Sequence, residues 1–126
     1  MKDINNMNFL DDRHEKQFYE FVSNMSSDDS YHTSMAYLLS LDRDCREHVV
    51  ELFDFENDRI KPNGQYADWQ TGTSIRTTRL AFNLWNAFVY KEDPVLSTPD
   101  QLFACELAPY YVEALHLRFP FYFDVE

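Results

Sequence analysis

Apolar residues recur at helical spacing along most of the chain. Phe18, Phe21, Val22 and Met25 illustrate the pattern, because their 3-1-3 spacing places them on one face of a helix. Comparable rows continue to about residue 118, interrupted by turn-forming residues. We therefore expect an all-α fold, a compact single-domain bundle of about six helices that spans residues 1–126.

Capping residues indicate where the helices begin. Side-chain oxygens of Asp, Ser and Thr accept hydrogen bonds from the free N–H groups of a first helical turn. Pro109 should end one helix near Leu107 and open the last, which continues to Arg118. The candidate caps, in chain order, are Asp11 or Asp12, one of residues 26–29, Asp42, Thr73 or Ser74, and Thr98.

Some segments lack a helical period. We expect residues 1–9, which are polar, to form a flexible N-terminal tail. Residues 54–73 should form a long irregular connection, because Pro62-Asn63-Gly64 is a turn signal within them. Residues 119–123 are strongly aromatic and are expected to pack back on the bundle, since exposing such a patch to water is unfavourable.

Composition excludes several classes of protein. Hydrophobic residues make up 44% of the chain, with 11 Phe, 8 Tyr and 2 Trp, which argues against disorder. Only 2 Gly are present, too few for a Gly-rich phosphate-binding loop. The N-terminal residues contain no apolar signal segment, and no apolar run reaches the ~20 residues of a membrane span. With 2 Cys and no disulfide framework, we expect a cytoplasmic protein that does not bind membranes.

The charge balance is strongly acidic. The chain has 22 acidic and 11 basic residues, for a net charge of −11. Residues 1–60 carry 14 acidic and 6 basic residues, and residues 61–126 carry 8 and 5. Because Lys and Arg supply most of the affinity for a phosphate backbone, we expect no direct binding to nucleic acid.

Six carboxylates form the candidate partner-binding surface. At helical spacing the first four would make one narrow stripe beside the apolar face of the third helix, and the others would extend it. The stripe is either a solvated helix face or a surface that replaces phosphates in a basic groove of a partner protein. The six residues are Asp44, Glu47, Glu51, Asp54, Glu56 and Asp58.

Two cysteines and two histidines are candidate zinc ligands. Cys45 and His48 are three residues apart, so both can point to one ion from a helix. His14 and Cys105 could complete a structural Cys2His2 site if the first three helices pack as neighbours. His32 and His116 are substitute ligands. The alternative is that both cysteines are small buried hydrophobic residues.

A local basic patch offers a different kind of site. Thr73 and Ser74 lie at an expected helix start, where free N–H groups can hold an anion. Arg76 and Arg79 follow within the first turns of the same helix. The four residues are a candidate anion-binding site, although such arginines more often pair with nearby acids.

Signals for catalysis are few. Cys45 with His48 is the only candidate nucleophile–base pair, and no nucleophile elbow or oxyanion loop accompanies it. We therefore expect a protein without enzymatic activity.

Several phrases of the chain resemble a family of small proteins, a domain of unknown function from Firmicute bacteria and their prophages. They are FLDDRHEKQF, YHTSMAYLLSLD, FDFENDRIKP, WQTGTSIRTTRLAFNLWN and CELAPYYVEALHLRFP, and the resemblance covers roughly residues 9–120. It implies a phage or mobile-element setting in a bacterial host cell, where small acidic proteins often disarm host defence. Anti-CRISPR proteins are the leading example of such inhibitors, and they share no common motif.

Two functions follow as hypotheses. In the first, the protein is an inhibitor that binds a host nucleic-acid-handling effector through its acidic surface and blocks access of DNA. A Cas9-type nuclease is the most specific candidate partner, because its target DNA runs through a positively charged channel. In the alternative, it is a small regulatory or catalytic domain that binds a phosphorylated ligand near residues 70–79.

Overall fold

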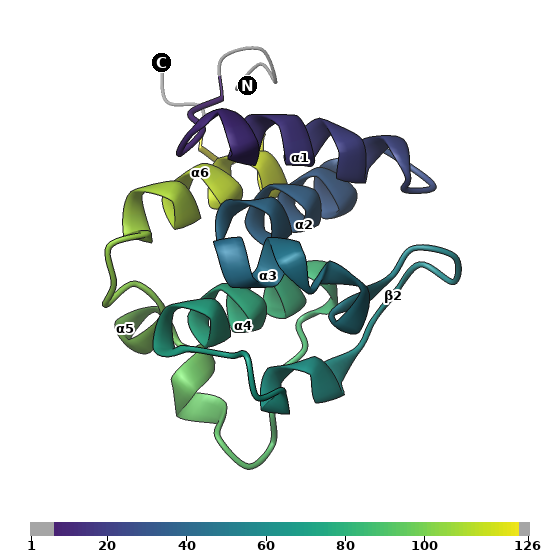
Figure 1. The fold of residues 1–126 in the computed structure, drawn as a ribbon. Helices are drawn as coiled ribbons and strands as arrows, with labels where there is room; N and C mark the ends of the chain where they lie inside the picture. Colours follow the sequence, from purple (N-terminus) through teal and green to yellow (C-terminus); the bar gives the residue numbers. More distant parts are fainter. Residues whose placement is uncertain (1–6, 124–126) are drawn as a thin grey trace.

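A computed structural model describes residues 7–123 of the chain. Within this range the fold is all-α, with short 3-10 turns and one two-stranded hairpin (Figure 1). The α-helices are α1 (Asp12–Ser23), α2 (Ser30–Leu41), α3 (Arg43–Glu47), α4 (Gly72–Asn86), α5 (Pro99–Leu102) and α6 (Ala108–Arg118). The remaining elements are η2 (Val49–Glu51), β1 (Phe53–Asp54), β2 (Arg59–Ile60), η3 (Pro62–Tyr66) and η4 (Pro94–Ser97).

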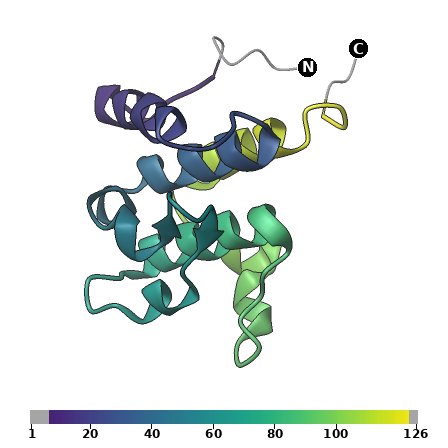
Figure 2. The same cartoon turned by 90° about the vertical axis from the view of Figure 1, so that its right-hand side faces the viewer.

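Helix α2 forms the centre of the molecule. Helix α1 lies on one side of it and α4 on the other, while α6 lies beside it (Figures 1 and 2). Ten of its twelve residues are buried, because its sequence is apolar or small on every face. Its buried hydroxyls are satisfied locally, as when Ser40 donates to the carbonyl of Ala36 at 2.6 Å.

Aspartate caps begin the first three helices, as the sequence predicted. Asp11 accepts from the His14 N–H at 2.8 Å, Asp29 from His32 N–H at 2.9 Å, and Asp42 from Cys45 N–H at 3.0 Å. The fourth cap was predicted at Thr73 or Ser74 and is wrong, since Thr71 occupies that position. Thr71 and Ser74 form a reciprocal capping box, so α4 starts two or three residues earlier than expected.

The third helix is much shorter than its apolar pattern predicted. It ends at Glu47, and His48 takes a non-helical conformation before the 3-10 turn η2. The chain then turns through an antiparallel pair in which Phe53 faces Ile60. Lys61 N–H donates to the carbonyl of Leu52 at 2.8 Å, so the expected irregular connection at 54–73 begins as an ordered hairpin.

The fifth helix is also short, whereas the last one is as predicted. Helix α5 ends at Leu102, and α6 runs from Ala108 to Arg118 with Pro109 in its first turn. The aromatic tail does not pack back as a unit. Phe121 is 79% and Tyr122 is 84% exposed, while Phe123 contacts the ring of His116.

The predicted boundary of the flexible tail, at residue 9, is placed too late in the chain. Met7 is buried, and the ring of Phe9 packs against Phe18 at a centroid distance of 5.6 Å. Tyr37 Oη donates to the carbonyl of Asn8 at 2.6 Å. Met7 and Phe9 therefore pack with the core, and residues 1–6 lie outside the described range.

Among residues 7–123 no helix has the length and apolar character needed to cross a membrane.

Candidate functional site

The six predicted partner-binding carboxylates do not form one helical stripe. Asp44 and Glu47 lie on α3, Glu51 lies on η2, and Asp54 lies on β1. Glu56 and Asp58 belong to the turn that connects β1 with β2. The prediction of a stripe was wrong because it assumed a continuous helix over residues 42–54. The chain leaves the helical conformation at His48.

The turn of the hairpin is built on Asp54. One of its oxygens accepts from the backbone N–H groups of Glu56 and Asn57, both at 3.0 Å. The other accepts from the Asn57 side chain at 2.8 Å. These bonds lower the pKa of Asp54, with the Asn57 side chain as the largest cause. Asp54 therefore organises the turn that presents Glu56 and Asp58.

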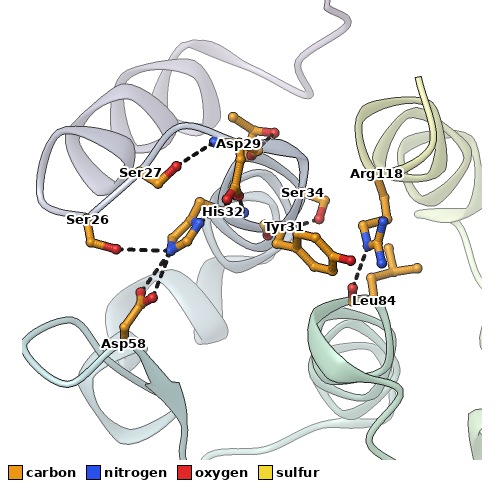
Figure 3. Close-up of polar contacts among 10 residues, drawn as sticks. Ser26, Ser27, Asp29, Tyr31, His32, Ser34, Asp58, Leu84 and Arg118 are labelled. Carbon is orange, nitrogen blue, oxygen red and sulfur yellow. Dashed lines mark hydrogen bonds and ion pairs between the residues drawn. The ribbon is translucent and has the colours of Figure 1, made fainter. Parts of the chain in front are cut away.

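Asp58 holds the turn of the hairpin against the start of α2 (Figure 3). Its carboxylate accepts from His32 Nε2 at 2.8 and 3.1 Å, and Asp29 accepts from His32 Nδ1 at 2.7 Å. Ser26 Oγ lies 3.3 Å from the same Nε2. Since both ring nitrogens donate to carboxylates, His32 is an imidazolium. We call Asp29, His32 and Asp58 the acid–histidine clasp.

The electrostatics of the clasp agree with its geometry. Burial by itself would lower the pKa of His32, but the hydrogen bonds to Asp29 and Asp58 outweigh it and raise that pKa. For Asp29, burial would raise the pKa, and the bonds from His32 outweigh burial and lower it. Asp58 has a positive φ of 58°, a conformation that Asp tolerates better than most residues. The clasp thus fixes the hairpin on the helical body.

A groove lies between α1 and the hairpin. It has a volume of about 470 Å³, and its floor includes Phe21, Val49 and Phe55. Val50 also lines it and is 63% exposed. Gln17, Asn24 and Glu56 complete the lining. We call this feature the α1–hairpin groove.

Further carboxylates lie on the segments next to this groove. Glu56 lines it, and Glu51, whose Oε2 is 3.0 Å from His48 Nδ1, adjoins Val50 in the chain. Asp58 follows in the same turn, and its partner His32 brings it beside the 24–29 loop, which carries exposed Asp28 and Asp29. In Figure 1 this loop and the turn of the hairpin lie on the same side of the molecule. We call Asp28, Asp29, Glu51, Glu56 and Asp58 the acidic face.

The predicted zinc ligands are not brought together. His14 is buried with both ring nitrogens occupied: Nδ1 accepts from Leu10 N–H at 3.0 Å and Nε2 donates to the Tyr37 carbonyl at 2.9 Å. Burial lowers its pKa to about 4. In the described part of the chain, no three His, Cys, Asp or Glu side chains group closely enough to hold a metal.

The other three expected ligands point to different surroundings. Cys45 is buried against α4, with its Sγ 3.5 Å from the Thr78 hydroxyl, and burial raises the pKa of its thiol. His48 stacks on Trp69 at 4.5 Å. Cys105 Sγ donates to the Leu102 carbonyl at 3.8 Å. Zinc binding stays a prediction that elemental analysis of the purified protein tests.

The predicted anion-binding residues divide into two groups. Ser74 is buried, and its hydroxyl donates to Gln70 Oε1 while accepting from Thr71 N–H in the cap of α4. Thr73 lies in the same turn, and its Oγ1 is 3.4 Å from a Glu106 oxygen. Arg76 and Arg79, by contrast, line one cavity. The structure therefore keeps the arginine pair together and assigns Ser74 to helix capping.

Comparison with known proteins identifies the family. A family model described as a family of unknown function, DUF6075, matches residues 4–126. The chain belongs to DUF6075. No curated protein and no solved structure matches the chain.

In this DUF6075 chain, sequence reasoning missed the central residue of the clasp. His32 was expected only as a substitute zinc ligand, whereas it joins two carboxylates. The contact between Asp29 and His32 was predictable from the sequence, because Asp29 is the N-cap of α2 and His32 follows it by three residues. The contact between His32 and Asp58 was not, since Asp58 is 26 residues further along the chain.

Proposed function

We propose that the protein is a non-enzymatic binding protein, and that its acidic face and α1–hairpin groove dock on a basic surface of another protein. The observation that carries the proposal is the combination of a largely apolar groove, lined by Glu56, with further carboxylates on the neighbouring segments. An exposed residue such as Val50 loses unfavourable contact with water when a partner covers it. The carboxylates select a partner with Lys or Arg around an apolar contact.

Preorganisation supports the same proposal. Asp54 orders the turn, and the clasp holds that turn on α2, so Glu56 is presented on a fixed backbone. A docking surface that is ordered before binding loses less conformational entropy when its partner arrives. The net charge of −11 adds a long-range attraction to basic proteins, which raises the association rate at low salt.

The narrowest form of the proposal concerns a host nucleic-acid-handling effector. In a basic nucleic-acid channel, carboxylates such as Glu51 and Glu56 would replace phosphates and block access of DNA. A Cas9-type nuclease, whose channel is positively charged, is the partner to test first. This form rests on the phage setting that the family resemblance implies, and it would make the protein an anti-CRISPR inhibitor.

Binding to a guide-loaded Cas9-type nuclease tests the partner and the surface together. We expect a complex at about 50 mM salt that weakens strongly at about 300 mM, because salt screens exposed charges. The double variant Glu51→Gln/Glu56→Gln should bind about tenfold more weakly. The control Asp100→Asn/Glu106→Gln removes the same charge from exposed residues near α5 and should bind normally. Absence of a complex at low salt, or equal loss in both double variants, would contradict the proposal.

The apolar part of the surface has a matched control of its own. Val50 and Val95 are each 63% exposed, but only Val50 lines the α1–hairpin groove. Val50→Ser should weaken the complex by about fivefold, while Val95→Ser should leave it unchanged. Neither change should lower the melting temperature appreciably, because both side chains are largely in water. Equal affinity of the two variants would show that the groove takes no part in docking.

A further inference from the structure

A second cavity lies away from the acidic face, where the start of α4 meets η4 and α5. These elements contact one another at the lower left of Figure 1. The cavity has a volume of about 260 Å³ and is lined by Gly72, Ile75, Arg76, Arg79, Leu96 and Gln101. Its only charged lining residues are two arginines, in a chain with twice as many acidic as basic residues.

Neutral groups hold both arginines in place. Arg76 Nε donates to the Gln101 carbonyl at 3.0 Å, and its Nη1 donates to the Gly72 carbonyl at 3.1 Å. Arg79 Nε donates to Gln65 Oε1 at 3.1 Å. Within residues 7–123, neither guanidinium has a carboxylate at ion-pair distance, although Arg43 pairs with Glu47. The Arg79 guanidinium also lies over the Tyr90 ring, 5.9 Å from its centroid. Among the described residues, no hydrogen bond occupies the other guanidinium N–H groups.

The two charges stand close enough to affect each other. Both side chains are half-buried. Burial is the largest cause and lowers the pKa of Arg79, while Asp93, from beyond ion-pair distance, and Tyr90 oppose it. The charge of Arg76 lowers this pKa by a smaller amount. Two like charges at a partly desolvated site are stabilised when an anion joins them. An anion in the cavity would therefore stabilise this pair of arginines.

The backbone around the cavity favours an anion as well. Gly72 is the first residue of a helix of 15 residues, so the positive end of the helix dipole lies at the cavity. A Cβ at Gly72 would stand 3.4 Å from Arg76 Nη1, which is ordinary contact. Planar guanidinium groups bind phosphate oxygens through paired N–H donors.

We infer that Arg76 and Arg79 bind the phosphoryl group of a small phosphate monoester, or free phosphate, in the cavity between α4, η4 and α5. The oxygens accept from the free guanidinium N–H groups, and Ile75 and Leu96 provide the apolar walls. This inference is independent of the proposed function, because it concerns residues of the opposite charge on other elements.

Calorimetric titration of the full chain at constant ionic strength tests the inference. The probes are inorganic phosphate, AMP and adenosine, with sodium chloride as the ionic control. We expect saturable binding of phosphate or AMP and none of adenosine or chloride. Tighter binding of AMP than of phosphate would identify a monoester as the ligand, and equal binding would identify phosphate itself. Absence of saturable binding by both phosphate and AMP would overturn the inference.

Variants then locate the site. Arg79→Gln should weaken phosphate binding by about tenfold or more, and Arg79→Lys, which keeps the charge but loses the planar donors, by less. Arg59→Gln is the charge-matched control, since Arg59 is exposed on β2. Melting temperatures without ligand show whether each variant is folded. If Arg59→Gln weakens binding as much as Arg79→Gln, the effect is one of net charge and the assignment of the cavity is refuted.

Should Arg79→Gln fail to fold, backbone NMR of the wild-type chain tests whether phosphate binds in the cavity. Phosphate should shift the amide resonances of Gly72 and of residues 75–79 more than those of the hairpin. Shifts confined to other parts of the chain would overturn the inference.

Discussion

His14 shows how a polar residue can belong to the core rather than to a site. Its two ring nitrogens connect the backbone before α1 to the middle of α2, through Leu10 N–H and the Tyr37 carbonyl. A buried imidazole with both nitrogens satisfied this way must be neutral, and burial accordingly lowers its pKa to about 4. The buried position was predictable from the apolar stripe of the first helix, whereas its hydrogen-bond partners were not.

Acid should therefore destabilise the protein through His14. Between pH 6.5 and pH 4 the unfolded chain binds a proton at His14 that the native state excludes, so stability falls as the pH falls. The free energy of unfolding should drop by about 2 kcal/mol from pH 7 to pH 5 on this account. Urea unfolding of the wild type and of His14→Gln measures it.

His14→Gln is expected to be less stable than the wild type at pH 7, and its free energy of unfolding should change less with pH. His48→Gln, on a half-exposed histidine, should keep the wild-type slope. An unchanged slope in His14→Gln would assign the acid sensitivity to other groups.

The acid–histidine clasp predicts the opposite pH dependence of stability from that of His14, in a higher pH range. His32 has a raised pKa in the native state, so its stabilisation is complete below the unfolded pKa of about 6.5. It is lost as the pH rises through the native pKa. Asp58→Asn removes one carboxylate and keeps a residue that tolerates positive φ. Its destabilisation should be about 1 kcal/mol at pH 6 and smaller at pH 9.

Chemical denaturation at the two pH values measures this difference, with Asp28→Asn as a control at an exposed neighbouring acid. A destabilisation that grows with pH would exclude an imidazolium in the clasp.

At the scale of elements, the starts of the aspartate-capped helices were predictable, whereas the ends of α3 and α5 were not. A cap depends on a side chain and a backbone N–H two or three residues away, which explains why Asp11 and Asp42 were identified. The end of α3 depends instead on the hairpin that follows. Leu52 is fully buried and its carbonyl is bonded to Lys61 N–H, contacts that a continuous helix would forfeit.

Gly64 fixes how the segment after the hairpin packs on η2. A Cβ at this position would overlap the Glu51 carbonyl oxygen and the Leu52 side chain, so the close approach requires glycine. Gly64→Ala should lower the free energy of unfolding by about 2 kcal/mol, as overpacking does elsewhere. Urea unfolding at neutral pH is the measurement.

The chain has one other glycine, which serves as the control. At Gly72 the nearest atom to an added Cβ is 3.4 Å away, at the end of the Arg76 side chain. Gly72→Ala should change stability by less than about 0.5 kcal/mol. Equal effects at both glycines would mean that the backbone contact at Gly64 can relax.

At the scale of the whole molecule, the charge of −11 has two consequences of opposite sign. Self-repulsion destabilises the compact state, so raising sodium chloride from about 20 to about 200 mM should raise the melting temperature. The same salt should weaken docking to a basic partner. Thermal unfolding measures the first effect. The melting temperature of Glu51→Gln/Glu56→Gln should rise less with salt, because this variant carries fewer negative charges. A melting temperature that falls with salt would show that attractive ion pairs dominate the fold.

The sequence by itself determined the helical class, the aspartate caps and the acidity, because spacing, capping and composition act within a few residues or over the whole chain. Only the tertiary structure decided how the carboxylates are used. It ended α3 early, brought Asp58 to His32 and placed Arg76 and Arg79 in the lining of one cavity. These contacts join residues far apart in the chain, and their energies depend on burial and on neighbours that no local pattern contains.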